Sequence, residues 1–515
     1  MQAAFASRDH LSRLGFTLLP DNLNNDRLNP GNLLPVGLVK DNRPGKYNTE
    51  WAGLTCSACH TGQMNFQNTS YYVDGGVGLL DLEKVELDLL DALNDTLNNA
   101  SKLGRFVDDV LGAEHLTQDR ERLIEDLADF TADFNSRVER AKPSTDIVYG
   151  PGRTDAFTIL INEAVCQILP IPTNCRPANS PTKYYQLWGI PSFDWLQSNS
   201  LTHQALGRNL GEVIGVHIDA EINADGSISS SADLPALHAL EEWIKELKSP
   251  QDLWPFGELD QDRITLGETL YIKNCGGCHF LPDGDGRYPK NEDLPDFNKN
   301  TGRWDAEGTY VKTRNIPLEL IGTDSKLIEG FAGRNANPGP LRPLIEAAGM
   351  DFGDQEEIPA GIIMAVIQRG IIQTFLAAAG LDLQAAIEMN DFRNPEVTPE
   401  LSQLGGYKAR PLDGIAYAAP YLHNNSVRTV MDLLKPAHER QAVFNTGTHD
   451  YDPVNLGYED GGYFTFDTSI PGNHNTGHEF GPAKATYTPE SDSLENDRLA
   501  IIEFLKTLKV TPTRK

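Results

Sequence analysis

CSACH at residues 56–60 and CGGCH at residues 275–279 are two copies of the pattern C-x-x-C-H. This pattern attaches c-type haem: two thiols add to the porphyrin vinyl groups as thioethers, and the adjacent histidine ligates the iron. A zinc ribbon or a thioredoxin-like dithiol competes with this interpretation, but neither requires a histidine after each pair. The predicted attachment residues are Cys56, Cys59, Cys275 and Cys278, and the predicted proximal ligands are His60 and His279.

The composition is acidic, with 44 Lys and Arg residues against 73 Asp and Glu residues and a net charge of −29. Such a field repels nucleic acid and anionic membrane surfaces, so neither is expected as a partner. Apolar residues make up 39% and charged residues 23%, which is ordinary for a globular protein with a sizeable core. No apolar run approaches the length of a membrane span, so none is expected.

The two remaining cysteines, Cys166 and Cys175, lie on either side of a proline-bearing loop. A disulfide that closes this loop is predicted, and it fits an oxidising compartment, as does the attachment of c-type haem. The expected location is therefore periplasmic or secreted. The first ten residues, MQAAFASRDH, lack the basic and apolar regions of a secretory signal, so we expect that a signal has been removed.

The two haem motifs are too far apart for one small cytochrome domain, so one haem per domain is expected. The predicted domains are residues 1–250 and 251–515, with a boundary candidate at 247–260, which is rich in Pro, Asp and Gly. The sequence GETLY at 267–271 resembles the start of a cytochrome c domain. Such folds end in a helix packed on the first one. The terminal helix is predicted to present Leu499, Ile502, Phe504 and Leu505 on its apolar face.

Helical spacing of apolar and acidic residues predicts further helices at 79–100, 116–141 and 234–248. The stretches 281–312 and 445–490 are rich in Gly, Pro and Asn and carry little strand pattern. The predicted fold class is mostly α, loop-rich with few strands, and built from two cytochrome c-like haem domains.

Each haem iron has a second axial position, whose occupant decides between electron transfer and binding of a small molecule. His423 and His478 are candidates for this position at the second haem. His478 is favoured because its loop is rich in Gly and Asn, and Met431 is a weaker third candidate. In the first domain only His203 is comparable, and we expect it to stand above the iron without ligating it. The first haem is therefore the candidate for the open site.

Six segments, spread over nearly the whole chain, resemble the bacterial dihaem cytochrome c peroxidase superfamily, and within it the branch of the dihaem rubber oxygenases. They are GLTCSACHTGQ (53–63), YYVDGG (71–76), YGPGRTDAF (149–157), YYQLWGIPSFDW (184–195), APYLHNNSV (419–427) and GNHNTGHEFG (472–481). The resemblance implies an active amino-terminal haem with His60 as its proximal ligand. It also implies a second haem at His279 that has two protein ligands and handles electrons.

The resemblance also bears on the remaining candidates. In the rubber oxygenases the second axial histidine lies close to the carboxyl end, which matches His478 better than His423. His423 then matches a Leu-His-Asn-Gly-Ser motif near the second haem, in which Asn425 stands in place of the glycine.

The peroxidases place a glutamine and a glutamate over the reactive iron for acid–base cleavage of the O–O bond. Gln204 occupies a similar place, whereas Glu212, the nearest glutamate, does not fit the spacing well. Rubber oxygenases use an apolar distal pocket, which Trp188, Phe193 and Trp195 would suit unless they are simply core residues. Trp188 is also a candidate electron relay between the haems.

Three functions remain open. The favoured one is a dihaem oxygenase that activates oxygen at the first haem and oxidises or cleaves double bonds of polyisoprene or an unsaturated fatty acid. The alternative is a hydrogen peroxide-reducing peroxidase that draws electrons from a small redox protein. The third is an electron carrier with both irons closed. Two covalently attached haem c groups are the expected cofactors, and a calcium ion between the domains is left open.

Overall fold

The computed structural model describes residues 7–20, 34–41, 51–141, 147–216, 218–250, 254–281, 311, 313–382, 385, 389, 405–485 and 492–508. Within these ranges helices predominate, strands are short and long segments are irregular, which confirms the predicted mostly α, loop-rich class. Nearly all of the predicted loop at 281–312 lies outside the described residues.

The helices form where periodicity predicted them: the segments 79–100, 116–141 and 234–248 contain α2, α4 and α7. Asp81 and Asp233 each accept a hydrogen bond from a first-turn backbone N–H, so α2 and α7 begin at side-chain caps. The helices are α1 (Arg8–Arg13), α2 (Leu82–Asn98), α3 (Ala100–Leu111), α4 (Thr117–Ala141), α5 (Ala156–Asn162), α6 (Ala205–Gly215), α7 (Leu234–Glu246), α8 (Gln261–Asn274), α9 (Leu318–Ile321), α10 (Lys326–Ala332), α11 (Arg342–Ala347), α12 (Ala360–Ala379), α14 (Val430–Leu433) and α15 (Asp492–Leu505).

The described strands pair only as two-stranded antiparallel ladders. Several lie in 445–490, where the sequence carries little strand pattern, because strands of two to four residues are too short to show an alternation. The pairs are β1 (Leu38–Asp41) with β2 (Trp51–Leu54), β3 (Thr61–Phe66) with β4 (Thr69–Asp74), β5 (Arg153–Thr154) with β6 (Thr182–Lys183), β7 (Ala220–Ile222) with β8 (Ile228–Ser230), β9 (Arg314–Pro317) with β12 (Gly406–Ala409), β10 (Asn335–Ala336) with β11 (Ile358–Pro359), β13 (Val443–Thr446) with β16 (Phe464–Asp467) and β14 (Tyr451–Asp452) with β15 (Gly457–Tyr458).

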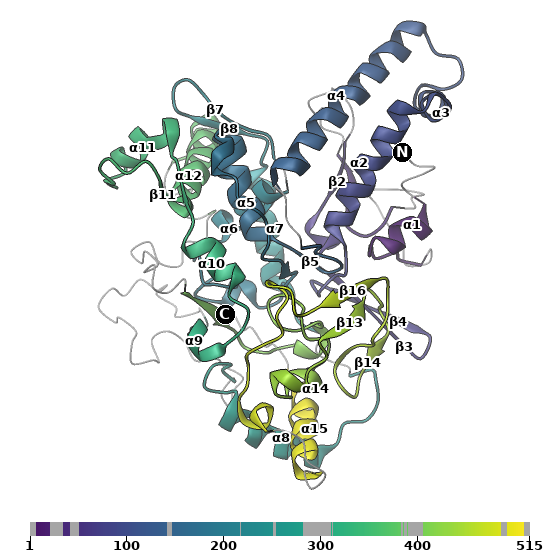
Figure 1. The fold of residues 1–515 in the computed structure, drawn as a ribbon, viewed down its shortest axis with the longest axis vertical. Helices are drawn as coiled ribbons and strands as arrows, with labels where there is room; N and C mark the ends of the chain where they lie inside the picture. Colours follow the sequence, from purple (N-terminus) through teal and green to yellow (C-terminus); the bar gives the residue numbers. More distant parts are fainter. Residues whose placement is uncertain are drawn as a thin grey trace.

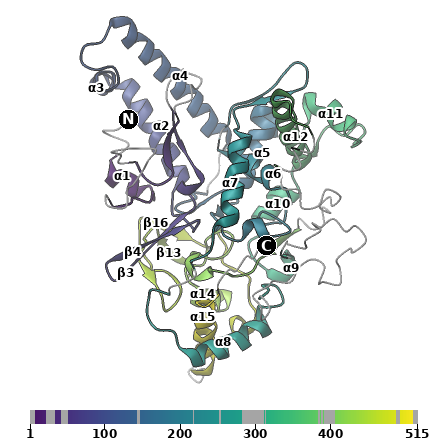
Figure 2. The ribbon, with the colours of Figure 1, turned by 180° about the vertical axis from the view of Figure 1, so that it is seen from behind.

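The helix that precedes the second haem motif packs on the terminal helix, as predicted. In Figures 1 and 2, α8 and α15 lie together at one end of the molecule, and the pair α2 and α4 projects from the other. The backbones cross so closely at Gly267 that a Cβ there would lie 1.9 Å from the carbonyl oxygen of Ala500. Beside the crossing, the rings of Tyr271 and Phe504 are 5.3 Å apart. Of the predicted apolar face, Ile502, Phe504 and Leu505 are buried and Leu499 is half-buried.

Two large apolar clusters form the core, and both draw residues from before and after residue 250. The two predicted domains therefore share their apolar cores, and the boundary at 250 stays a prediction. The first cluster, here the α5–α12 core, includes Ile161, Leu210, Ile316 and Ile363. The second, here the α8–α15 core, includes Leu79, Trp188, Tyr271 and Ile502.

Helix α12 corrects one expectation about the chain. It is 20 residues long with a mean hydropathy of 1.7 over an 18-residue window, which is long and apolar enough to cross a membrane by length and composition. The sequence pattern concealed this because Gln368 and Arg369 interrupt the apolar run. Its side chains Ile363, Ile367 and Ile371 are buried in the α5–α12 core.

Candidate haem sites

The two C-x-x-C-H motifs fold into the same turn. In the first, the backbone N–H of His60 donates to the carbonyl oxygen of Cys56 at 2.9 Å; in the second, His279 donates to Cys275, also at 2.9 Å. The turn brings each histidine back beside its two cysteines, as covalent attachment to one porphyrin requires.

Different elements carry the two turns. Helix α8 leads directly into the second motif, as in the predicted cytochrome c arrangement, whereas the first motif lies between strands β2 and β3. Gly37, with a φ of 82°, packs against the first turn so closely that a Cβ would lie 2.1 Å from the nitrogen of Ala58. The helix-delivered arrangement is thus present only at the second motif.

Both motif histidines are oriented by a backbone carbonyl. The Nδ1 atom of His60 donates to the carbonyl oxygen of Tyr185 at 2.7 Å, and that of His279 donates to the carbonyl oxygen of Arg410 at 2.7 Å. Each bond leaves Nε2 as the free ligand atom and fixes the ring, which is the usual outer-shell arrangement of a metal-binding imidazole. Burial lowers the pKa of His60 to about 4 and also lowers the pKa of His279, so both imidazoles are neutral.

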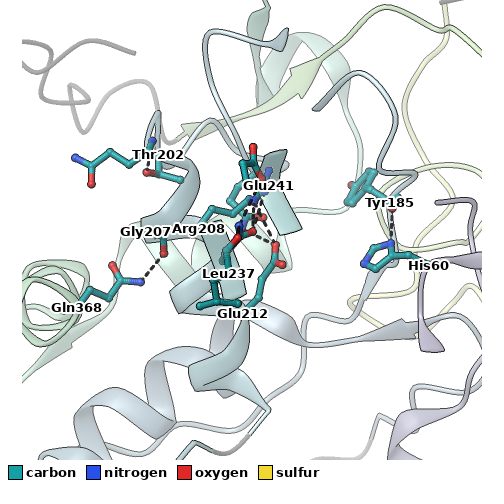
Figure 3. Close-up of polar contacts among 12 residues, drawn as sticks. His60, Tyr185, Thr202, Gly207, Arg208, Glu212, Leu237, Glu241 and Gln368 are labelled. Carbon is teal, nitrogen blue, oxygen red and sulfur yellow. Dashed lines mark hydrogen bonds and ion pairs between the residues drawn. The ribbon is translucent and has the colours of Figure 1, made fainter. Parts of the chain in front are cut away.

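Helix α6 brings a charged cluster, of which Arg208 and Glu241 are buried, towards the first motif (Figure 3). Arg208 pairs with Glu241, and its Nε lies 3.9 Å from a carboxylate oxygen of Glu212. Arg208 contributes to the lowered pKa of His60, and Glu212 contributes to the raised pKa of Cys56, in each case after burial. Glu212 keeps 52% of its side chain accessible, yet burial still raises the pKa of its carboxyl. The surrounding polypeptide therefore removes part of the water around this carboxyl, although the side chain stays accessible.

The residues predicted near the first iron lie in different parts of the fold. Trp188 is fully buried in the α8–α15 core, and its indole N–H donates to the carbonyl oxygen of Asp413 at 2.9 Å. His203 is buried with its ring edge-on to Trp195 at 5.1 Å. Gln204 stands at the amino-terminal cap position of α6.

Phe193 is buried beside positively charged side chains. Two cations lie over its ring, Arg410 at 4.8 Å and Lys408 at 5.4 Å from the centroid. Positive charge therefore lies over this one ring, because Lys408 is in β12 and Arg410 directly follows that strand.

His478 lies close to the second motif. It is half-buried, and its lowered pKa of about 3 results first from desolvation and then from the nearby His279. Its backbone N–H donates to the carbonyl oxygen of Ile321 at 3.0 Å, and Arg440 donates to the preceding carbonyl oxygen of Gly477 at 2.7 Å. Within the described ranges no partner is found for its Nδ1. A buried ring nitrogen without a partner is costly, and a metal nearby would satisfy the imidazole.

His423 occupies a hydrogen-bonded position instead. Its Nε2 lies 3.0 Å from the hydroxyl of Tyr407, whose ring stacks on it at 4.2 Å, and that hydroxyl donates to the carbonyl oxygen of Asp324. Asn425 has a φ of 60°, so asparagine adopts here the left-handed conformation for which the related motif uses glycine. Met431 lies in α14 at the edge of the α8–α15 core.

The four motif thiols do not converge on one site. Cys59 packs near Ala58 and Leu80, whereas Cys275 packs against the α8–α15 core and Cys278 against the α5–α12 core. Over the ranges that can be described, no cluster of three or more His, Cys, Asp or Glu could hold a metal ion. The separation of the thiols disagrees with a zinc ribbon, which gathers its thiolates around one ion.

The predicted disulfide between Cys166 and Cys175 is confirmed, with a Cα–Cα distance of 5.6 Å. Cys166 lies in the π-helical continuation of α5 (Glu163–Ile168), and Cys175 follows a short turn at Pro172–Asn174. The bridge closes this turn over the α5–α12 core.

Sequence reasoning missed the residues that orient the imidazoles. Tyr185 and Arg410 act through backbone carbonyls, which every residue has, and they are far from their histidines along the chain. Arg440, which holds the His478 loop, was missed for the same reason. The only available signal was the quoted segment at 184–195.

The turn, the oriented imidazoles and the α8–α15 pair define a cytochrome c-like protein with covalently bound haem c. A family model described as RoxA-like, cytochrome c-like matches residues 406–445, which include Arg410 and His423. The uncharacterized protein y4iJ of Sinorhizobium fredii is 30% identical over 538 residues, covering 98% of this chain and 85% of that protein. The uncharacterized protein y4iM of the same organism is 47% identical over 53 residues, which is 10% of this chain and 12% of that protein.

The chain therefore belongs to the same family as y4iJ. Together with the haem motifs, the match at 406–445 identifies a c-type haem oxidoreductase of the RoxA-like, cytochrome c-like kind.

Proposed function

We propose that the protein is a dihaem oxygenase of the rubber oxygenase branch of the dihaem cytochrome c peroxidase superfamily. It uses dioxygen to oxidise or cleave double bonds of an apolar substrate, polyisoprene or an unsaturated fatty acid. The observation that carries the proposal is an asymmetry between the two motifs. The half-buried His478 lies close enough to His279 for that residue to lower its pKa, and its Nδ1 has no partner among the described residues, whereas the charged residue that lies near His60 is Arg208.

The residues present fit two haem groups. Cys56, Cys59 and His60 would hold one, and Cys275, Cys278 and His279 the other, where His478 would supply a further imidazole. When bound, haem supplies the iron chemistry that binds dioxygen and moves electrons. The polypeptide orients both imidazoles through carbonyls and keeps them neutral by burial.

The proposed partners and location follow from the same features. Dioxygen or peroxide and an apolar substrate would meet at the His60 side, and a small redox protein would exchange electrons through the His279 side. The disulfide between Cys166 and Cys175 supports a periplasmic or secreted location, because such bonds persist in oxidising compartments. The net charge of −29 argues against nucleic acid as a partner.

The test is oxygen uptake by the purified holoprotein with polyisoprene latex or oleic acid and no added reductant. We expect oxygen consumption together with carbonyl or hydroperoxide products identified by mass spectrometry. The variant His60→Ala should abolish both. Uptake without oxidised product, or no uptake with either substrate, would contradict the proposal.

A peroxidase is the second candidate, and one observation favours it. Glu212 lies near enough to Cys56 and Cys59 to affect both thiols, so α6 supplies a carboxyl near the first haem that the sequence spacing did not indicate. General acid–base groups contribute roughly 100-fold to 10,000-fold to a rate. In a peroxidase, Glu212→Gln should lower peroxide-dependent oxidation of a reduced cytochrome by at least the lower figure. In the oxygenase, the same variant should leave oxygen uptake within a few-fold of wild type.

A further inference from the structure

Arg410 stands between the two histidines of the haem motifs. Its guanidinium donates from Nη1 to the carbonyl oxygen of Gln186 at 3.2 Å and from Nη2 to that of Trp188 at 2.7 Å. Its own carbonyl oxygen accepts the hydrogen bond from Nδ1 of His279 at 2.7 Å. One residue thus clamps the segment 186–188 with its side chain and orients an iron ligand with its backbone.

The clamped segment begins next to the acceptor for the other histidine. Tyr185, whose carbonyl oxygen accepts from Nδ1 of His60 at 2.7 Å, immediately precedes Gln186. A continuous run of covalent bonds and hydrogen bonds therefore joins the imidazole of His60 to that of His279 through Arg410. Every hydrogen bond in this run is 3.2 Å or shorter.

The clamp is held on two further sides. The guanidinium lies over the ring of Phe193 at 4.8 Å, in a cation–π contact. The indole N–H of the fully buried Trp188 donates to the carbonyl oxygen of Asp413 at 2.9 Å, a second link between the same two segments. The arginine therefore has little freedom to leave the two carbonyls.

We propose that Arg410 is a positioning residue that couples the two haem sites of the proposed oxygenase. The step it assists is the transfer of one electron between the haems, in which one iron is oxidised, the other is reduced, and no bond or proton moves. The hydrogen-bonded run provides a through-bond path between the two imidazoles, and the fixed positive charge beside His279 would favour the reduced form of the haem there. This inference rests on the proposed presence of two haems.

The test compares Arg410→Gln with Arg410→Lys in the holoprotein. Haem content is measured first, then both reduction potentials by spectroelectrochemical titration, then electron transfer between the haems after flash photolysis. We expect R410Q to shift the reduction equilibrium of the His279 haem about tenfold towards the oxidised form, or about 59 mV for one electron. Electron transfer should slow at least tenfold.

Lysine keeps the charge but cannot bind two carbonyls with a planar fork. We therefore expect R410K to restore the equilibrium to within about threefold of wild type while transfer stays slow. Arg342 is the matched control, because it donates from Nη1 and Nη2 to the carbonyl oxygens of Gly353 and Gln355, on the other side of the α5–α12 core. R342Q should leave the potentials and the transfer rate unchanged.

Unchanged potentials and transfer rate in a two-haem R410Q protein would overturn this inference and leave the proposed function standing. An equal shift in R342Q would overturn it too. If R410Q does not fold, R410K provides the test. A wild-type rate of electron transfer between the haems in R410K would count against the clamp. Fewer than two haems per wild-type chain would overturn the proposed function along with the inference.

Discussion

At the scale of single residues, a haem site is built here as much by carbonyl acceptors as by the motif. A neutral imidazole binds iron through the ring nitrogen that carries no proton, so an acceptor for Nδ1–H leaves Nε2 as the ligand atom and fixes the ring. Tyr185 and Arg410 provide this for His60 and His279, each from more than 100 residues away along the chain. The tertiary structure therefore orients the histidine of each C-x-x-C-H motif.

The first prediction concerns the attachment of each haem. Replacing both cysteines of the second motif in C275A/C278A should lower the haem content from two to one per chain, because both thioethers of that haem are lost. C56A/C59A should do the same for the first haem. The pyridine haemochrome assay measures the content directly. The control C166A/C175A removes only the disulfide and should keep two haems. A C275A/C278A protein that still carries two haems, or a C166A/C175A protein that carries fewer than two, would contradict the assignment.

The second prediction separates the two candidate axial histidines. His478→Ala should convert the haem at His279 from low spin to high spin, because a strong ligand is removed. His423→Phe should leave it low spin, because Nε2 of His423 is engaged with Tyr407 and phenylalanine keeps the ring stacking. Electron paramagnetic resonance of the oxidised protein measures the spin state in both variants. A high-spin signal that arises only in H423F would reverse the assignment.

At the scale of elements, the contact between α8 and α15 positions the second motif, because α8 ends where Cys275 begins the turn. The third prediction is that Gly267→Ala destabilises the protein by about 1–3 kcal/mol, since the added Cβ would overlap the carbonyl of Ala500. Gly104→Ala is the control: this glycine also lies inside a helix, α3, with nothing within 4 Å of its Cβ position. It should stabilise the protein by about 0.5–1 kcal/mol. Guanidinium unfolding gives both values, and equal effects would contradict the close crossing.

What the sequence predicts at this scale depends on whether the determinants are local. The helices α2, α4 and α7 and the α8–α15 pair were predictable because apolar periodicity and a glycine-containing helix leave a local pattern. The short hairpins of 445–490 were not, because two to four residues show no periodicity. The placement of Glu212 near Cys56 was not predictable either, since it depends on how α6 packs rather than on spacing along the chain.

At the scale of the whole molecule, the two motif regions are joined rather than merely adjacent. Trp188 belongs to the α8–α15 core, although it lies before residue 250, and its neighbour Arg410 reaches back to the segment that orients His60. Both sites consequently depend on cores that combine residues from before and after residue 250, so a change in the protonation of a buried histidine acts on the stability of both parts of the chain.

The fourth prediction is that acid destabilises the protein through its buried histidines. Burial lowers the pKa of His423 to about 4, below the value of 6.5 that an exposed histidine has. As the pH falls below 6.5, the unfolded chain takes up a proton that the folded chain does not, so stability present above pH 6.5 is lost down to about pH 4. The raised pKa of Asp155 acts in the opposite direction.

His423→Phe isolates one of these contributions, because phenylalanine cannot take up a proton in either state. Between pH 7 and pH 5 the free energy of unfolding should fall by about 2 kcal/mol less in H423F than in wild type. Guanidinium unfolding of the holoprotein at both pH values measures the difference. His438, whose side chain is 68% exposed, provides the control H438A, which should follow the wild-type pH dependence. If H423F also follows it, then His423 is not kept neutral by the fold, and the buried histidines do not set the acid limit of this protein.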